Sequence, residues 1–199
     1  LWKKLCYNFC MMLKLINSKK LDEKIYSDIQ AQFPPEEIKT LEEFNDLLRE
    51  GSYKLGLVYD EKILIGYILY IKKDFIWIDY IAVLQEFHSK GYGSKILTAI
   101  FEKYSSLKGC YFEVEPEDKQ NPHTVRRINF YKKLGCIELQ FKYYFPNPVR
   151  KLEMKLLYKS FNGLIPDKEI IKKDIEKVFK NLHENVECKN EILSLIQQE

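Results

Sequence analysis

The feature that most constrains the fold lies between residues 75 and 104, where a strand pattern, a loop with two glycines and a helix pattern follow one another. Residues 75–83 are apolar on nearly both faces, which is typical of a central strand buried on both sides. After the loop, apolar residues recur at helical spacing, at Ile96, Leu97, Ile100, Phe101 and Tyr104. This spacing predicts a helix packed on a sheet. Gly91 and Gly93 stand between the two elements and suggest a backbone that approaches another group closely.

The rest of the chain also alternates between strand and helix patterns. We expect strands at residues 12–16, 53–59, 63–71, 110–115, 136–145 and 151–161, and helices at residues 22–33, 36–49 and 124–134. Pro34 and Pro35 end the first helix, Gly51 ends the second and Gly135 ends the third. Mixed elements in this order predict a layered α/β or α+β domain.

Composition limits the classes of function. The 199 residues are enough for one domain with a sizeable core and an appendage. A formal net charge of +3 is too small to argue for nucleic-acid binding by itself. The five cysteines form no paired framework, which favours a reduced, cytoplasmic setting. Cys6 and Cys10 lack a second ligand cluster, so we expect no metal, and no segment approaches the length of a membrane span.

The two ends of the chain differ from its middle. The chain begins with Leu1, and we expect residues 1–11 to be an upstream extension and residues 12–162 to form the main domain. Residues 163–199 are predicted to form a helical appendage, which opens at Pro166 and Asp167. Its apolar stripe consists of Ile171, Ile175, Val178, Phe179, Leu182 and Val186. This stripe is expected to pack on the domain or on a second copy of the chain.

The glycine loop does not follow the two common phosphate-binding patterns. Ile96 stands where a dinucleotide-binding fingerprint has its third glycine, and "GSK" lacks the ending of a P-loop. A strand, a short loop and a helix nevertheless aim backbone N–H groups and the positive end of a helix dipole at one point. Two interpretations are open: a phosphate or pyrophosphate seat with Lys90 and Lys95 at its rim, or a tight turn with a glycine N-cap.

Two stretches together resemble the GNAT superfamily of N-acetyltransferases. The acetyl-CoA-binding motif of that family is Gln/Arg-x-x-Gly-x-Gly/Ala, and the chain reads His88, Ser89, Lys90, Gly91, Tyr92 and Gly93. Residues 126–136, "RRINFYKKLGC", resemble the second motif of the family, with the strand "GCYFEVE" between the two. The resemblance covers residues 13–161. It implies a central, mostly antiparallel twisted sheet flanked by helices, to which the C-terminal helical extension is added.

The resemblance also implies a donor site for acetyl-CoA. The backbone of residues 88–94, from His88 through Ser94, is then expected to hold the pyrophosphate, although His88 replaces the customary Gln or Arg. The strand residues Ile81, Ala82 and Val83 are expected to pair with the pantetheine arm and to polarise the thioester. Thr124 stands where many relatives have an Asn that contacts this arm.

Tyr131 occupies the place of the tyrosine that protonates the leaving thiolate in such enzymes. A phenol with its high pKa is a reasonable proton donor to a thiolate. The alternative for Tyr131 is a core or rim aromatic whose hydroxyl is satisfied by a neighbouring group.

The general base is harder to assign. An amine must lose a proton before it attacks, and strand alternation places Glu113 and Glu115 on one face. Glu113 is the first candidate and Asp79, inside an apolar strand, is the second. Glu115, Arg126 and Arg127 are candidates for binding the substrate. The alternatives are structural pairs between the two glutamates and the two arginines, and a hydrogen bond from Asp79 to backbone at a bulge.

The predicted function is acetyl-CoA-dependent transfer of an acetyl group to a small amine, a peptide amine or an aminoacyl group. The alternative is a GNAT-like module that binds an acyl-CoA without turnover, as a sensor or scaffold. Nucleic-acid binding is a weaker hypothesis because the net charge is modest. No membrane partner is expected, and a homodimer through a sheet edge or the C-terminal helices is a further prediction.

Overall fold

The structure is a computed structural model that describes residues 13–147, 151–184 and 186–196. The strands are β1 (Lys14–Ser18), β2 (Tyr53–Asp60), β3 (Ile63–Lys72), β4 (Ile76–Val83), β5 (Gly109–Val114), β6 (Ile137–Glu138), β7 (Tyr143–Pro146) and β8 (Lys151–Ser160). They form one sheet in the order β1-β2-β3-β4-β5-β8-β6, with β7 also paired to β8. Among the described strands, β4 and β5 are parallel and the other pairs are antiparallel. The predicted mixed fold with a mostly antiparallel sheet is confirmed.

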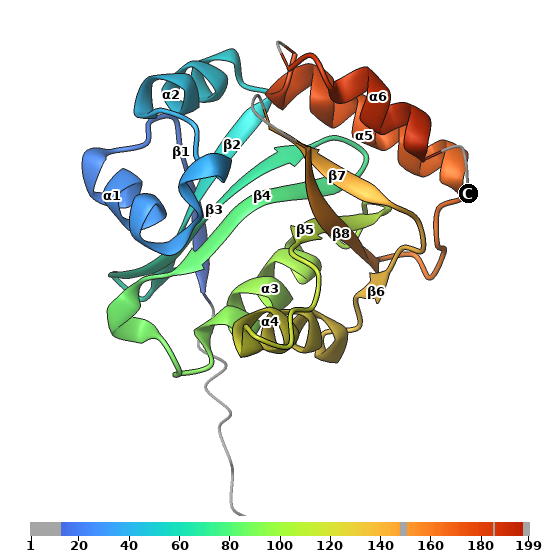
Figure 1. Cartoon of the computed structure of the whole chain (residues 1–199). Helices are drawn as coiled ribbons and strands as arrows, with labels where there is room; N and C mark the ends of the chain where they lie inside the picture. The colour runs from blue at the N-terminus through green and yellow to red at the C-terminus, as the bar shows by residue number, and fades with distance from the viewer. Residues whose placement is uncertain (1–12, 148–150, 185, 197–199) are drawn as a thin grey trace, which may run out of the picture.

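Helices cover both faces of this sheet. The α-helices are α1 (Glu23–Gln32), α2 (Leu41–Glu50), α3 (Tyr92–Lys103), α4 (Pro122–Lys133), α5 (Lys168–Leu182) and α6 (Lys189–Leu195), and the 3₁₀ helices are η1 (Pro35–Glu37) and η2 (Gln85–Phe87). Figure 1 shows α3 and α4 on one side of the sheet and α1, α2, α5 and α6 on the other. Tyr67 and Leu69 of β3 accordingly join one buried cluster, and Ile68 and Tyr70 join the other.

The first predicted helix is confirmed, but the second begins later than its sequence pattern suggested. The prediction started it at residue 36, whereas α2 starts at Leu41. The hydroxyl of Thr40 accepts a hydrogen bond from the backbone N–H of Glu43, and the Glu43 carboxylate accepts one from the N–H of Thr40. This capping box fixes the helix start. Residues 36–39 therefore lie outside α2, the first two in η1 and the other two in the link from η1 to α2.

The predicted central strand is confirmed as β4, which has a bulge at Asp79. Leu69 pairs with Tyr80 and Tyr70 pairs with Ile78, so Asp79 is the extra residue on the bulged strand. Pairing of β4 with β5 covers only residues 76–78 of β4. The two strands separate beyond Ile78, and the edge of β4 at residues 79–83 is not paired with β5.

The closing strands differ from the prediction in one place. Residues 136–145 were predicted as one strand, but the structure divides them into β6 and β7. The two short strands both pair with β8. A tight turn, in which the N–H of Phe141 bonds to the carbonyl of Leu139, takes the backbone between them out of the ladder.

The C-terminal segment forms α5 and α6. The side chain of Asp167 caps α5 by accepting a hydrogen bond from the N–H of Ile170. The predicted stripe is buried at Ile171, Ile175, Val178 and Phe179 and belongs to the cluster that also contains residues of α1 and α2. Val186 lies beyond the end of α5, so including it in the stripe of one helix was wrong. No helix in the described parts of the chain is long and apolar enough to cross a bilayer.

Candidate active site

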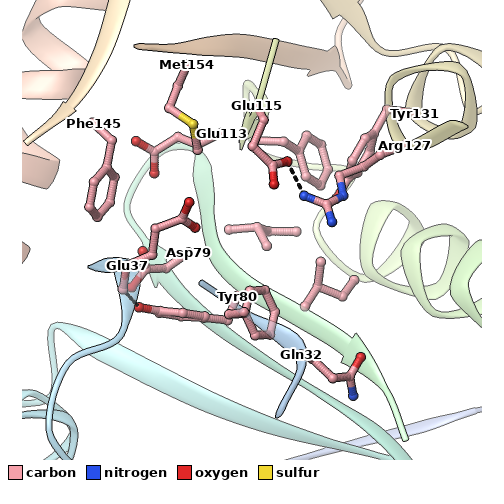
Figure 2. A pocket seen from close by; sticks show the side chains of 14 residues that line it. Gln32, Glu37, Asp79, Tyr80, Glu113, Glu115, Arg127, Tyr131, Phe145 and Met154 are labelled. Atoms are coloured by element: carbon pink, nitrogen blue, oxygen red, sulfur yellow. Dashed lines mark hydrogen bonds and ion pairs between the residues drawn. The ribbon is translucent and has the colours of Figure 1, made fainter. Parts of the chain in front are cut away.

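A cavity of about 140 Å³ lies where β4 and β5 separate. It brings together six residues that the sequence predicted for the site: Asp79, Ile81, Glu113, Glu115, Arg127 and Tyr131. Their side chains come from β4, from the end of β5 and from α4. Figure 2 labels Asp79, Glu113, Glu115, Arg127 and Tyr131 around one space. The sequence did not predict the part of the lining contributed by Glu37, Phe145 and Met154.

Tyr131 is a buried residue on the inner side of α4. Its ring packs on Phe112 of β5, with ring centroids 4.7 Å apart. Burial raises the pKa of the Tyr131 hydroxyl, and the nearby Arg127 guanidinium opposes this rise. No described residue is hydrogen-bonded to this hydroxyl, which lies at the cavity wall. Tyr131 is therefore a neutral phenol that has a proton to donate.

Glu113 has hydrogen-bonding partners that the sequence did not indicate. Its carboxyl group accepts a hydrogen bond of 2.6 Å from the hydroxyl of Tyr143 and one of 3.1 Å from the indole N–H of Trp77. Burial raises the pKa of Glu113 to about 8, although both hydrogen bonds act to lower it. The predicted pairing of Glu113 with an arginine is wrong, and the side chain carries little charge at pH 7.

Asp79 has its negative charge balanced by a neighbouring lysine. The Asp79 carboxylate accepts a hydrogen bond of 2.5 Å from the hydroxyl of Tyr53, and the ammonium group of Lys39 lies 3.4 Å away. The side chain of Asp79 is only 3% exposed, so this ion pair is shielded from water. The predicted bulge is present, but the partners of Asp79 are two side chains instead of the predicted backbone group.

Glu115 forms the predicted ion pair with Arg127, drawn as a dashed line in Figure 2. Glu115 follows the end of β5 and Arg127 lies in the second turn of α4, so the pair spans the two elements. Arg126 is exposed on α4 and does not line the cavity, so the structure does not place it with the other predicted substrate-binding residues.

Glu37 is the carboxylate that the sequence prediction missed. It lies in η1, and its backbone carbonyl accepts a hydrogen bond from the hydroxyl of Tyr80 on β4. Burial, followed by repulsion from Glu115, raises the pKa of Glu37 to about 7. No described side chain is hydrogen-bonded to its carboxylate, which points into the cavity in Figure 2. The Thr40-x-x-Glu43 capping box is the sequence signal that could have placed Glu37 before the start of α2.

The glycine loop joins the end of β4 to α3. Gly91 is the N-cap of α3 with φ of +77°, a left-handed conformation that favours glycine. A Cβ added at Gly91 would meet no described atom within 4 Å, so within the chain it is the backbone angle that requires glycine. No described side chain caps the first N–H groups of α3, which are those of Tyr92, Gly93 and Ser94. Uncapped N–H groups at the positive end of a helix dipole are able to bind an anion.

The predicted side chains of the loop are bonded within the chain. The ring Nε2 of His88 is 2.8 Å from the carbonyl oxygen of Val83, and the ammonium group of Lys90 donates to the carbonyl of Glu86. The hydroxyl of Tyr92 donates to Asp60 at 2.6 Å. Ser89, like Gly91, has a positive φ, of 61°. These bonds fix the shape of the loop and leave its backbone N–H groups as the donors for an anion.

The β4 edge predicted to meet the pantetheine arm lies between the loop and the cavity. Ile81 and Val83 are half-buried and Ala82 is buried. Across the sheet, a Cβ added at Gly66 would lie 2.3 Å from the carbonyl oxygen of Ala82, so glycine is required there for β3 to approach β4.

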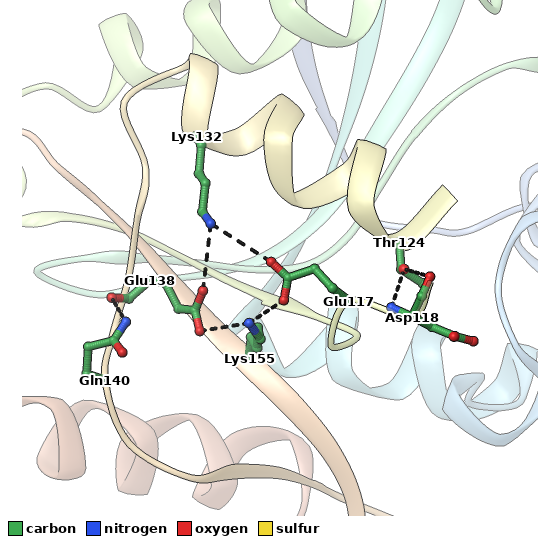
Figure 3. Close-up of polar contacts among 7 residues, drawn as sticks. All are labelled: Glu117, Asp118, Thr124, Lys132, Glu138, Gln140 and Lys155. Atoms are coloured by element: carbon green, nitrogen blue, oxygen red, sulfur yellow. Dashed lines mark hydrogen bonds and ion pairs between the residues drawn. The ribbon is translucent and has the colours of Figure 1, made fainter. Parts of the chain in front are cut away.

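The hydroxyl of Thr124 is hydrogen-bonded to backbone groups of the turn that precedes α4. This hydroxyl accepts a hydrogen bond of 2.9 Å from the N–H of Asp118 (Figure 3). The same hydroxyl donates one to the carbonyl of Asn121. Thr124 does not line the cavity, so its predicted contact with the pantetheine arm gains no support. In the same view, Lys132 and Lys155 form ion pairs with Glu117 and Glu138, which connect α4 to β8 and β6.

The carboxylates of the cavity are not arranged as a metal site. Within the described residues, no group of three or more histidine, cysteine, aspartate or glutamate side chains could hold a metal ion. Cys6 and Cys10, considered above as ligands, lie outside those residues.

Comparison with known proteins identifies the family to which the fold and the glycine loop belong. Residues 22–136, more than half of the chain, match the acetyltransferase (GNAT) family. A curated protein of Bacillus subtilis (strain 168), "Putative acetyltransferase YjbC", is 25% identical over 189 residues, which cover 87% of this chain and 93% of that protein.

Solved structures show the same fold. A GNAT-family structure from Bacteroides thetaiotaomicron, described as a "Putative acetyltransferase", has a TM-score of 0.67 and 27% identity, covering 87% of this chain and 97% of that one. A GNAT acetyltransferase from Elizabethkingia anophelis with acetyl-CoA bound has a TM-score of 0.55 and 18% identity, covering 75% of this chain and 98% of that one. The chain thus belongs to the GNAT family of acetyltransferases, whose general reaction is acetyl transfer from acetyl-CoA.

Proposed function

We propose that this protein is an N-acetyltransferase that moves an acetyl group from acetyl-CoA to a primary amine, which attacks the thioester directly. The observation that carries the proposal is the cavity at the β4–β5 separation, which brings Glu37 and Tyr131 to one space. A general base and a proton donor are the two groups that this reaction requires of the enzyme.

In this proposal, backbone groups of α3 and β4 form the binding site for acetyl-CoA. The N–H groups at the start of α3 would bind the pyrophosphate of acetyl-CoA, and the unpaired edge of β4 would bind the pantetheine amides as an added strand does. A backbone N–H of β4 beside the bulge would stabilise negative charge on the thioester oxygen. The thioester supplies the activated acetyl group.

Glu37 is the general base in this proposal, in place of Glu113 and Asp79. A base must be unprotonated to accept a proton, and it acts best when its pKa lies near the working pH. Glu37, with a pKa of about 7, meets both conditions, whereas Glu113 is largely protonated at pH 7 and Asp79 is paired with Lys39. Tyr131 then donates its hydroxyl proton to the leaving thiolate.

The first test is thermal unfolding of the protein with and without acetyl-CoA, followed by a free-thiol assay over a panel of amines. Binding to the folded state must raise the unfolding midpoint. No shift at millimolar acetyl-CoA would contradict the donor site. A shift without turnover of any amine would favour the acyl-CoA-binding module instead.

The second test compares Glu37→Gln with Glu42→Gln, a change at an exposed glutamate of α2. Loss of a general base lowers kcat by about 100-fold to 10,000-fold. In the wild-type protein kcat/KM should rise as Glu37 loses its proton near pH 7, and Glu37→Gln should abolish this rise. Glu42→Gln should keep both the rate and the pH profile. Wild-type kinetics in Glu37→Gln would remove Glu37 from this role.

The cytoplasmic location and the homodimer stay predictions. Some structural neighbours are oligomers, among them a dodecameric spermidine N-acetyltransferase from Vibrio cholerae, but its 17% identity to this chain supports the fold alone.

A further inference from the structure

The cavity contains four carboxyl groups but little free negative charge. Glu115 is paired with Arg127, and Asp79 is paired with Lys39. Each of these carboxylates already has a cation of the protein as its partner. A positively charged substrate group gains little from a carboxylate whose charge is balanced in this way.

The carboxyl group of Glu113 also has its hydrogen-bonding partners within the protein. Tyr143 and Trp77 each donate a hydrogen bond to one of its two oxygens. Those donors come from β7 and β4, so the group is enclosed by the sheet, and its pKa of about 8 keeps it largely neutral. Only Glu37, among the described carboxylates of the lining, is in neither an ion pair nor a side-chain hydrogen bond, although the more distant Arg127 guanidinium acts to lower its pKa. The cavity therefore has one place for one ammonium group.

The remaining wall of the cavity combines apolar side chains with the polar groups of Gln32 and Tyr131. Phe33, Ile78, Tyr80, Phe145 and Met154 line it, and the rings of Phe33 and Tyr80 meet edge to face with centroids 5.0 Å apart. A volume of about 140 Å³ is close to that of an engineered protein cavity, of about 150 Å³, that binds benzene. The apolar side chains suit a group of roughly six carbon atoms, and the described lining has no second unpaired carboxylate for a second charge.

A contact between two walls closes one side of the cavity. The side-chain amide of Asn147, next to the end of β7, donates a hydrogen bond to the carbonyl of Glu36 in η1. Their neighbours Glu37 and Phe145 line the cavity, so η1 and β7 are joined beside it. Asn147 is itself buried, and the thiol of Cys188 is within hydrogen-bonding distance of its carbonyl, at 3.7 Å. This contact joins η1 to β7 across the approach that an extended polypeptide would take between them.

From these observations, and resting on the proposed function, we infer that the acceptor is a small monoamine: one ammonium group attached to a compact, uncharged apolar substituent. The ammonium group binds at Glu37 and the substituent lies against Phe145 and Met154. Polyamines are poor acceptors because the described lining has no unpaired carboxylate for their second charge, which Lys39 and Arg127 would repel. Peptide amines are poor acceptors because η1 contacts β7.

The test uses two amines of the same length, pentan-1-amine and pentane-1,5-diamine, which differ in one charged group. The full-length protein should turn over the monoamine with kcat/KM at least about tenfold higher, since a second ammonium has no counter-charge in the cavity. A tripeptide with a free N-terminus and an apolar first residue should be poorer than the monoamine. Higher kcat/KM for the diamine or for the tripeptide would overturn the inference.

A variant makes the comparison sharper. Lys39→Met removes the cation beside Asp79 but keeps the length of the side chain, so Asp79 becomes available to pair with a second ammonium group. Its kcat/KM ratio of diamine to monoamine should rise about tenfold or more. Lys62→Met, at an exposed lysine in the β2–β3 turn, should keep the wild-type ratio. An unchanged ratio in a folded Lys39→Met protein would contradict the charge argument. If the variant does not fold, the wild-type comparison decides.

A binding measurement separates this inference from the proposed function. The unfolding midpoint of the wild-type protein with CoA is measured at equal concentrations of each amine. A larger rise with pentan-1-amine supports the inference even where no acetyl group is transferred, and a larger rise with the diamine overturns it. Absence of turnover with every amine contradicts only the proposed catalytic role.

Discussion

The side chains of Glu37 and Glu113 line one cavity but have different surroundings. Glu113 is enclosed between β4, β5 and β7 and is held by two hydrogen-bond donors. Glu37 lies in a short 3₁₀ helix and faces the cavity without such donors among the described side chains. Burial raises the pKa of both groups, to about 7 and about 8. At the residue scale, the different surroundings of two residues of the same type separate the proposed base, Glu37, from the enclosed Glu113.

The raised pKa of Glu113 predicts a pH-dependent stability. The folded protein holds this proton more tightly than the unfolded chain, whose Glu pKa is about 4.5. The stabilisation is therefore complete below pH 4.5 and is lost as the pH rises through about 8. In that window, Glu113→Gln should remove a fall in unfolding free energy of up to about 1.4 kcal/mol per pH unit.

Urea unfolding at several pH values between 5 and 8 measures this effect. Glu102→Gln, at an exposed glutamate of α3, is the matched control and should leave the slope unchanged. If Glu113→Gln keeps the wild-type slope, then Glu113 is ionised in the folded protein and the assignment of its protonation state is wrong.

At the scale of elements, the turn into α3 and the start of α2 shape the site. Gly91 gives α3 a start whose N–H groups face outward without a side-chain cap. The capping box at Thr40 begins α2 late enough to leave η1 and Lys39 in a connecting segment. That segment can then lie across the end of β4, where Tyr80 holds it. The starts of α3 and α2 thus place both the proposed donor seat and the proposed base.

Gly91→Ala tests the donor seat at this scale. Alanine in a left-handed conformation costs about 1–2 kcal/mol, so the turn is expected to shift. Gly163→Ala is a matched control, because Gly163 also has a positive φ, of 80°, and a Cβ there would meet no described atom within 4 Å. Both variants should lose similar unfolding free energy. Only Gly91→Ala should raise the KM for acetyl-CoA, and equal KM values in the two would contradict the assigned seat.

At the scale of the whole molecule, α5 belongs to the core that contains the site's walls. Its buried residues share one hydrophobic cluster with Trp77, Tyr143, Phe145 and Met154. Asp174 of α5 is buried, accepts a hydrogen bond from Tyr111 of β5 and is paired with Lys177. The ring of His183, which follows α5, packs edge to face on Phe145. The C-terminal helices therefore support β7 from behind the cavity.

Ile175→Ala measures how far α5 contributes to the stability of the molecule. Ile175 is fully buried, and such a truncation in a core costs about 2–5 kcal/mol. Ile170→Ala in the same helix changes a side chain that is 37% exposed and should cost less than about 1 kcal/mol. Urea unfolding compares the two variants. Equal, small losses would show that α5 is an independent appendage.

The sequence by itself determined the features that depend on local pattern. Period-two alternation placed Glu113 and Glu115 on one face, and the strand, glycine loop and helix around Gly91 followed from spacing and backbone freedom. The motif order around Tyr131 gave the family. These features need only neighbours within a few residues, which the sequence shows directly.

The tertiary structure decided which carboxylate of the cavity has neither an ion pair nor a hydrogen-bond donor among the described side chains. Asp79 forms an ion pair with Lys39, and Glu113 accepts a hydrogen bond from Tyr143. Each of these partners lies 30 or more residues away along the chain. The sequence did not indicate Glu37 because the apolar spacing predicted one helix over residues 36–49, whereas the capping box at Thr40 starts α2 after Glu37. Charge state depends on burial and on ion pairs between distant segments, and neither is encoded in local periodicity.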